Sequence, residues 1–144
     1  MNIVEESIVI DKPRKVVFDF FADPSTVTLY SSNVVEYDVV SGGPTEIGRK
    51  AKLAVKVAGV RLEYTDELTE FEDGAAMTLR ATEGRIPYTL RMSVADVGEG
   101  TRVTFHQETE SFGGVFKFAD KLVLKMYSRD VRGNLENAKV LLEE

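Results

Sequence analysis

The residues from Gly114 to Leu142 decide the fold, and they read GVFKFADKLVLKMYSRDVRGNLENAKVLL. On a helical projection the apolar side chains of this stretch form one broad stripe, and most of its charged side chains take the far side. The spacing predicts a single helix roughly 40 Å long. The stripe must be buried against another apolar surface. The predicted stripe contains Phe116, Ala119, Val123, Met126, Tyr127, Val131, Ala138 and Leu142.

The middle of the chain alternates apolar and polar residues with a period of two, which is typical of strands with one buried face. The alternation is clearest over residues 50–57, 77–82, 88–95 and 102–106, and glycine-containing turn signals separate these segments. The pattern predicts an antiparallel sheet, which supplies the surface that the long helix needs. Apolar strand residues expected to face the helix include Leu53, Val55, Leu79, Leu90 and Met92.

Two short helices are predicted after the first strand. The apolar spacing over residues 13–22 is helical, and Asp11 is placed to cap the start of this helix. Asp23 and Pro24 end it and begin a second short helix toward Tyr30. The order of elements predicts one α+β domain over residues 1–144, a curved antiparallel sheet of six to seven strands wrapped around the long C-terminal helix. We expect a cavity between sheet and helix.

Composition excludes several classes of function. The 144 residues are 43% hydrophobic and 29% charged, which is enough to bury a core, and the net charge of -6 disfavours broad binding to nucleic acid or anionic membranes. The lack of cysteine excludes thiolate chemistry, and the single histidine excludes paired-histidine metal motifs. We expect no metal and no cofactor. The sequence shows no secretory signal and no run of about 18 apolar residues, so the expected location is the cytoplasm.

Six sequence blocks resemble a known family in their order and spacing. They are SIVIDKP at residues 7–13, VVFDFFADP at 16–24, GPTEIGR at 43–49, ELTEFE at 67–72, GTRVTF at 100–105 and LENAK at 135–139. Together they span nearly the whole chain and are similar to the polyketide cyclase/dehydrase family of the START-like (SRPBCC, helix-grip) superfamily. The resemblance implies the wrapped-helix fold described above. The chain departs from the family at one place, because many members carry Trp after Ala-Asp-Pro where this chain has Tyr30.

A cavity between helix and sheet needs apolar walls and a few placed polar groups. Phe116, Val123, Met126 and Tyr127 are expected on the helix wall, facing the apolar strand residues. Asp130 is unusual, because a carboxylate within an apolar stripe needs a hydrogen-bond partner or a raised pKa. The alternatives are an edge position for Asp130 and a purely core-filling role for the tyrosines. The polar side chains expected to face inward are Tyr64, Tyr88, Gln107, Thr109, Tyr127 and Asp130.

Other polar features have simpler interpretations. His106 has the parity of the solvated face of its strand, so we expect a surface histidine. Tyr30 is expected on the lip of an opening or on the plain surface. The Gly-rich residues 42–48 lack a phosphate-loop lysine and are interpreted as a turn between strands. An acidic run is expected on a solvated face and not around a metal, and it consists of Glu63, Asp66, Glu67, Glu70 and Glu72.

Three functions remain open, and the sequence favours the first. The first is a binding module that holds a hydrophobic small molecule, such as a lipid, a quinone or a polyketide-like compound, with no catalytic residue. The second, which the resemblance implies for some members, is an aromatase/cyclase or dehydratase acting on a polyketide-like substrate. That reaction needs an acid and a base within reach of one substrate, for which the sequence offers Asp130 with Tyr64 or Tyr88. The third is a protein-interaction module with a filled core.

Overall fold

A computed structural model describes all of residues 1–144 and shows seven strands and three helices in the predicted order. A 3₁₀ turn at Pro24–Thr26 leads into the second helix. The helices are α1 (Arg14–Ala22), α2 (Val27–Tyr30) and α3 (Asp120–Glu143). The strands are β1 (Asn2–Ile10), β2 (Val34–Ser41), β3 (Lys50–Val57), β4 (Val60–Glu72), β5 (Ala76–Glu83), β6 (Tyr88–Val97) and β7 (Gly100–Thr109).

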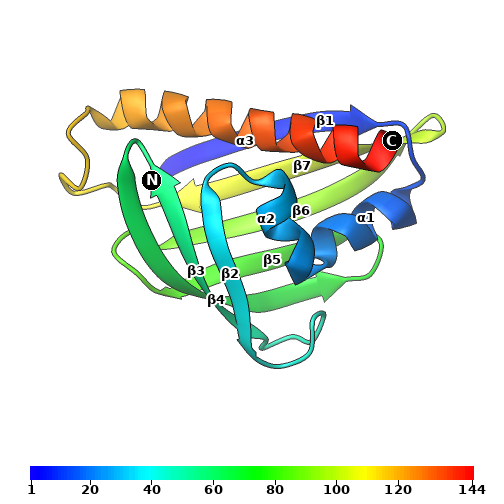
Figure 1. The fold of residues 1–144 in the computed structure, drawn as a ribbon, viewed down its shortest axis with the longest axis horizontal. Coiled ribbons are helices and arrows are strands. Elements are labelled where there is room, and N and C mark those ends of the chain that lie inside the picture. The colour runs from blue at the N-terminus through cyan, green and yellow to red at the C-terminus, as the bar shows by residue number, and fades with distance from the viewer.

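All seven strands form one antiparallel sheet in the order β1-β7-β6-β5-β4-β3-β2. Figure 1 shows that this sheet curves around one side of α3, which runs beside β1 at the sheet edge, while α1 and α2 lie at one end of the curve. The prediction of an α+β fold with a sheet wrapped around the C-terminal helix is therefore confirmed.

A tight turn sets the register of the β3–β4 hairpin. Its two central residues, Ala58 and Gly59, have φ angles of 49° and 81°. Positive φ at both positions is the type I′ geometry, whose twist matches that of the flanking strands. The resulting register places Leu53 directly opposite Tyr64, and both side chains are buried inside the curve of the sheet.

The long helix begins later than predicted. Its first residue is Asp120, and the residues from 110 to 119 form a loop. Gly113 and Gly114 have φ angles of 58° and 79°, a left-handed backbone that cannot continue a right-handed helix. Phe116 is consequently a loop residue, although its side chain is buried against the start of α3 as part of the core.

The predicted cap of α1 at Asp11 is wrong. The helix begins at Arg14 with Pro13 in the N-cap position, and no side chain caps it. Asp11 lies too far upstream, and its N–H instead donates a hydrogen bond of 2.8 Å to the Glu143 carboxylate. This contact ties the chain that follows β1 to the C-terminal end of α3.

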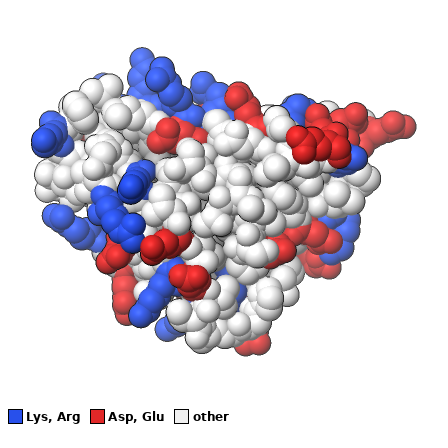
Figure 2. All heavy atoms as spheres, viewed as in Figure 1, with Lys and Arg blue, Asp and Glu red and all other residues white.

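Packing holds α3 in place more than its own charges do. Figure 2 shows Lys and Arg gathering at the end of the molecule where α3 begins, and Asp and Glu at the end where it finishes. The helix dipole favours the reverse distribution. The buried face of α3 includes Val123, Val131 and Leu135, and full burial of each such side chain contributes about 1.5–3 kcal/mol. No helix of the structure has the length and apolar content needed to span a membrane.

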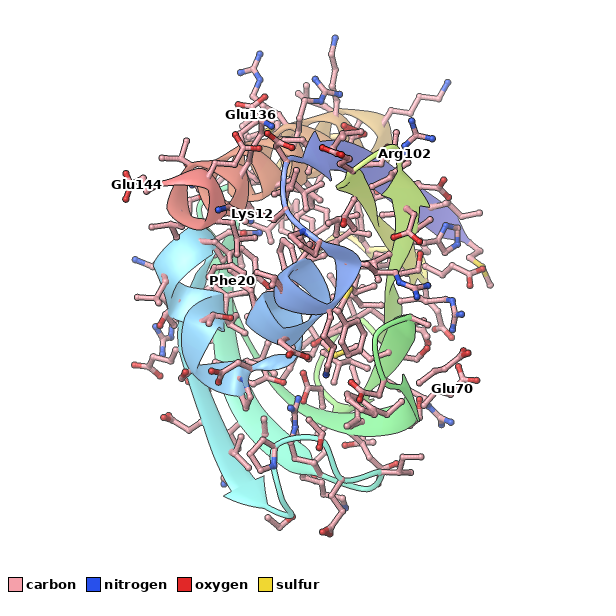
Figure 3. All side chains as sticks on the ribbon, turned by 90° about the vertical axis from the view of Figure 1, so that its right-hand side faces the viewer. Lys12, Phe20, Glu70, Arg102, Glu136 and Glu144 are labelled. Carbon is pink, nitrogen blue, oxygen red and sulfur yellow. The ribbon has the colours of Figure 1, made fainter.

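Two apolar clusters flank the centre of the molecule. The first packs α1, α2 and the C-terminal half of α3 against the sheet and includes Phe21. The second packs the β3–β4 hairpin against the start of α3 and the loop before it, and includes Leu62. Figure 3, viewed from the α1 end, shows α1 and α2 lying across the opening between α3 and the sheet, with Arg102 and Glu136 on the outside.

Candidate ligand-binding cavity

A cavity of about 150 Å³ lies between the two apolar clusters, under α3 and inside the curve of the sheet. Hydrophobic residues supply 25 of its 33 lining residues, so the wall is mainly apolar. Every strand and every helix contributes at least one lining residue. The cavity is therefore a property of the complete fold and not of one local segment.

Twelve of the fourteen residues predicted to line a cavity do border it. The pairing of the strands explains why, because Leu90 lies opposite both Leu79 and Gln107, and Tyr88 lies opposite Thr109. Residues that face each other in a ladder project from the same side of the sheet. The twelve are Leu53, Val55, Tyr64, Leu79, Tyr88, Leu90, Met92, Gln107, Thr109, Phe116, Val123 and Tyr127.

Met126 and Asp130 do not border the cavity, contrary to expectation. The cavity face of α3 carries Val123 and Tyr127, and a residue one position before Tyr127 is rotated away from that face by about 100°. Asp130 is half-buried, and burial raises its pKa while the nearby charge of Arg129 lowers it. Asp130 thus takes the edge position that was the alternative for it.

All five tyrosines of the chain border the cavity. Tyr30 was expected on a lip or on the surface, but it is only 7% exposed and packs edge-on against Phe21, with ring centroids 5.2 Å apart. The rings of Tyr64 and Tyr88 meet edge to face at 4.9 Å. Burial raises the pKa of every one of these hydroxyls, so all five remain protonated at neutral pH; they belong to Tyr30, Tyr37, Tyr64, Tyr88 and Tyr127.

A buried cluster of Arg49, Tyr37 and Asp66, here called the Arg–Tyr–Asp cluster, borders the cavity at strands β2 to β4. The Tyr37 hydroxyl accepts a hydrogen bond of 2.7 Å from Arg49 Nη2 and donates to the Asp66 carboxylate, whose oxygens lie 3.1 and 3.2 Å away. Arg49 Nη1 donates to the Pro44 carbonyl at 2.8 Å. Arg49 and Asp66 are each 1% exposed.

Asp66 is the one carboxyl among the residues that line the cavity. Burial raises the pKa of its carboxyl to about 6, while the hydrogen bond from Tyr37 and the charge of Arg49 act in the opposite direction. At neutral pH the carboxyl is mainly ionised and balances the guanidinium, and in mild acid it takes up a proton. A carboxyl poised in this range is suited to exchange protons with a bound molecule.

The expectation that Asp66 belongs to a solvated acidic face is wrong, because the acidic run straddles both faces of β4. Tyr64, Asp66 and Leu68 alternate on the buried inner face, while Glu63 is exposed on the outer one. The parity of Asp66 with Tyr64 and Leu68 is a signal that could have identified it. Tyr37 carries no such signal, because register irregularities at both ends of β2 interrupt its alternation.

Asn134 closes one side of the cavity by joining α3 to the segment between α2 and β2. Its carbonyl oxygen accepts a hydrogen bond of 2.9 Å from the Ser32 N–H. Its amide nitrogen donates to Asn33 Oδ1 at 2.8 Å and to Ser31 Oγ at 3.2 Å. With a side chain that is 6% exposed and bonded on both sides, Asn134 has no free polar atom for a ligand.

His106 lies on the outer face of β7, as its parity predicts. Its Nδ1 is 2.7 Å from a carboxylate oxygen of Glu5, which lies opposite it on the neighbouring strand β1. His106 does not border the cavity. The one imidazole of the chain is therefore absent from the candidate site.

Comparison with known proteins agrees with this architecture. Three solved structures superpose over nearly their full length. TTHA0849 from Thermus thermophilus is 21% identical with a TM-score of 0.85, and the match covers 99% of this chain and 97% of that chain. A START superfamily protein from Mycobacterium smegmatis is 10% identical with a TM-score of 0.81 (98% of this chain and 97% of that chain), and the Zhui aromatase/cyclase from Streptomyces sp. R1128 is 16% identical with a TM-score of 0.75 (99% of this chain and 93% of that chain). At these identities the similarity establishes the fold alone.

The sequence itself establishes the family. No curated protein matches the chain. The sequence model of the family described as "Polyketide cyclase / dehydrase and lipid transport" matches residues 1–143. Because this match covers essentially the whole chain, the protein belongs to the family described as polyketide cyclase / dehydrase and lipid transport.

Proposed function

We propose that the protein binds a hydrophobic small molecule, a lipid, quinone or polyketide-like compound, in this cavity and does so in the cytoplasm. The observation that carries the proposal is a cavity whose 33 lining residues include 25 hydrophobic ones. Desolvation supplies the affinity, at about 25 cal/mol per Å² of apolar surface buried. The family description, which names lipid transport, supports the same function. A protein-interaction module with a filled core is disfavoured by the cavity.

The size of the cavity limits what fits without a change in the walls. A volume of about 150 Å³ is comparable with that of an engineered apolar cavity that binds benzene. A single ring is accommodated directly, and a larger ligand requires a wall to move. Besides α1 and α3, the walls outside the sheet include α2, the β5–β6 turn with its buried Ile86, and the loop from 110 to 119. These segments are the proposed route of entry.

Native mass spectrometry tests the proposal on protein purified from its own host, with denaturing extraction of any molecule that co-purifies. We expect a bound hydrophobic compound. Leu90→Trp places an indole in the cavity wall and should expel this compound, whereas Leu29→Trp, at a position that is 65% exposed on α2, should retain it. Equal occupancy in the two variants, or no binding of any hydrophobic probe by the wild type, would contradict the proposal.

A second candidate function is a cyclase or dehydratase reaction on a polyketide-like substrate. The observation that favours it is the Asp66 carboxyl, with a pKa raised to about 6, beside a cavity that Tyr88 also borders. In this second proposal the acid is Asp66 on β4, in place of Asp130. Asp66→Asn separates the two functions, because it should keep ligand binding and abolish any turnover that depends on a proton from this carboxyl.

A further inference from the structure

Some polar groups around the cavity have hydrogen-bond partners within the chain, and others do not. Tyr127 donates a hydrogen bond of 2.6 Å to Gln107 Oε1, and the Arg–Tyr–Asp cluster is bonded internally through its tyrosine. Two buried atoms on the lining residues, Arg49 Nε and Thr109 Oγ1, have no partner. Buried polar groups are nearly always paired, so each of these two requires an explanation.

Tyr88 adds a third unpaired group beside Thr109. Its hydroxyl forms no hydrogen bond within the chain, and its pKa is raised by burial and by the nearby carboxylate charge of Asp66. Tyr88 and Thr109 are directly opposite each other in the β6–β7 ladder, so both side chains project from the inner face of the sheet on adjacent strands. The two hydroxyls form a polar pair in an otherwise apolar wall, here called the hydroxyl pair.

The unpaired groups share one property, because each can donate a hydrogen bond. A guanidinium N–H only donates, and a hydroxyl donates whenever an acceptor is available. The strong acceptors of the cavity, the Asp66 carboxylate and the Gln107 carbonyl, already receive hydrogen bonds from tyrosines. A ligand with an acceptor oxygen therefore satisfies groups that the chain leaves unpaired, whereas a plain hydrocarbon chain leaves them so.

Charge balance indicates that this oxygen is uncharged. The ionised Asp66 carboxylate already balances the buried Arg49 guanidinium through Tyr37. A ligand carboxylate would add a second buried anion without a second cation, and uncompensated charge is costly in a buried site. A carbonyl oxygen accepts hydrogen bonds without bringing a net charge.

We propose that the cavity selects an uncharged ring compound that carries a carbonyl group, and that the hydroxyl pair of Tyr88 and Thr109 holds the carbonyl oxygen. The inference rests on the proposed function, because it names the ligand class of the same cavity. The aromatic side chains of the lining and the volume of about 150 Å³ favour a ring over an extended chain.

Four probes test the inference on the full chain at neutral pH. Ethylbenzene, acetophenone and phenylacetate share a benzene ring and differ in the oxygen atoms of the side chain, and octanoate is an extended chain. Binding is measured from the chemical-shift changes of backbone amides during titration. We expect acetophenone to bind about tenfold more tightly than ethylbenzene, the effect of one or two hydrogen bonds. Phenylacetate and octanoate should bind more weakly than acetophenone.

Variants assign the preference to the hydroxyl pair. The double variant Tyr88→Phe/Thr109→Val keeps the ring and the side-chain volume and should reduce acetophenone to the affinity of ethylbenzene. The matched control is Thr89→Val, a neighbouring position of β6 that does not border the cavity, and it should keep the preference.

The outcomes separate this inference from the proposed function. Equal binding of ethylbenzene and acetophenone by the wild type, tighter binding of octanoate, or an unchanged preference in the double variant would overturn the inference and leave hydrophobic binding intact. A lack of binding by all four probes would overturn both. A preference for acetophenone that only the double variant loses supports both.

Discussion

Asp66 couples the stability of the fold to pH. Its pKa is raised from 3.8 to about 6 in the folded protein, mainly because the carboxyl is buried. Between these pH values the folded protein binds a proton that the unfolded chain has released, so stability falls as pH rises through this range. The full contribution of the protonated Asp66 carboxyl to the free energy of unfolding is present below about pH 4 and is lost above about pH 6. A shift of about two pKa units corresponds to about 3 kcal/mol.

The substitution Asp66→Asn removes this dependence while it keeps the side-chain size and an acceptor oxygen for the Tyr37 hydroxyl. The unfolding free energy of the variant minus that of the wild type should rise by about 3 kcal/mol as the pH increases from about 4 to about 7. For a chain of this length that difference corresponds to about 6–12 °C in Tm. The pKa of about 6 already includes the effect of the Arg49 charge, which lowers the pKa of Asp66 and so acts against the shift caused by burial.

The assay is urea unfolding across this pH range, followed by circular dichroism, because the chain has no tryptophan. Taking the difference between variant and wild type cancels the titration of all other groups. Asp38→Asn is the matched control, since Asp38 is exposed on the strand that carries Tyr37 and does not border the cavity. Parallel pH profiles for Asp66→Asn and the wild type would show that the carboxyl is solvated, and would refute the argument.

Three further substitutions, one of them with a matched control, test the packing around the cavity. Gly84→Ala places a Cβ well inside the contact distance of the Tyr64 ring, at a φ of 142°. It should lower the free energy of unfolding in urea by about 2–4 kcal/mol. The control Gly98→Ala, at a φ of 61° with open space around it, should lower it by about 1–2 kcal/mol. Asn134→Ala should cost about 2–3 kcal/mol and accelerate amide exchange in residues 31–33; unchanged exchange would mean that this segment is held without α3. Thr109→Val removes a buried hydroxyl without a partner and should raise Tm, and a fall in Tm would show that the hydroxyl is satisfied.

The fold was predictable because it depends on periods that recur over many residues. Alternation with a period of two identified the buried faces of β3, β5, β6 and β7, and pairing in register then brought those faces together. The start of α3 was not predictable from apolar spacing alone. The stripe continues back through Phe116, but the left-handed backbone of Gly113 and Gly114 ends any helix before Asp120. A helical period shows which residues share a face and does not show where the backbone leaves the helix.

The apolar part of the candidate site followed from the same periods, and its polar part did not. Val123 and Tyr127 border the cavity where the stripe placed them. Asp66 was assigned by composition, as one acid in an acidic run, although its parity with Tyr64 is the parity of the buried face. Arg49 precedes β3, and it meets Tyr37 on β2 and Asp66 on β4 through tertiary contacts. Contacts of that kind have no local sequence signal.

The position of Asp66 also relates the two candidate functions to each other. At neutral pH the ionised carboxylate balances Arg49, so an uncharged ligand enters an electrically neutral site and no proton needs to move. Below about pH 6 the same carboxyl is mainly protonated. In its ionised form its charge raises the pKa of the Tyr88 hydroxyl, so the two groups border the same part of the cavity. A carbonyl oxygen held there would lie near a proton donor. Under the two proposals, binding and acid catalysis would use one arrangement in two protonation states. Turnover that rises as pH falls through about 6, and is absent in Asp66→Asn, would identify the catalytic state.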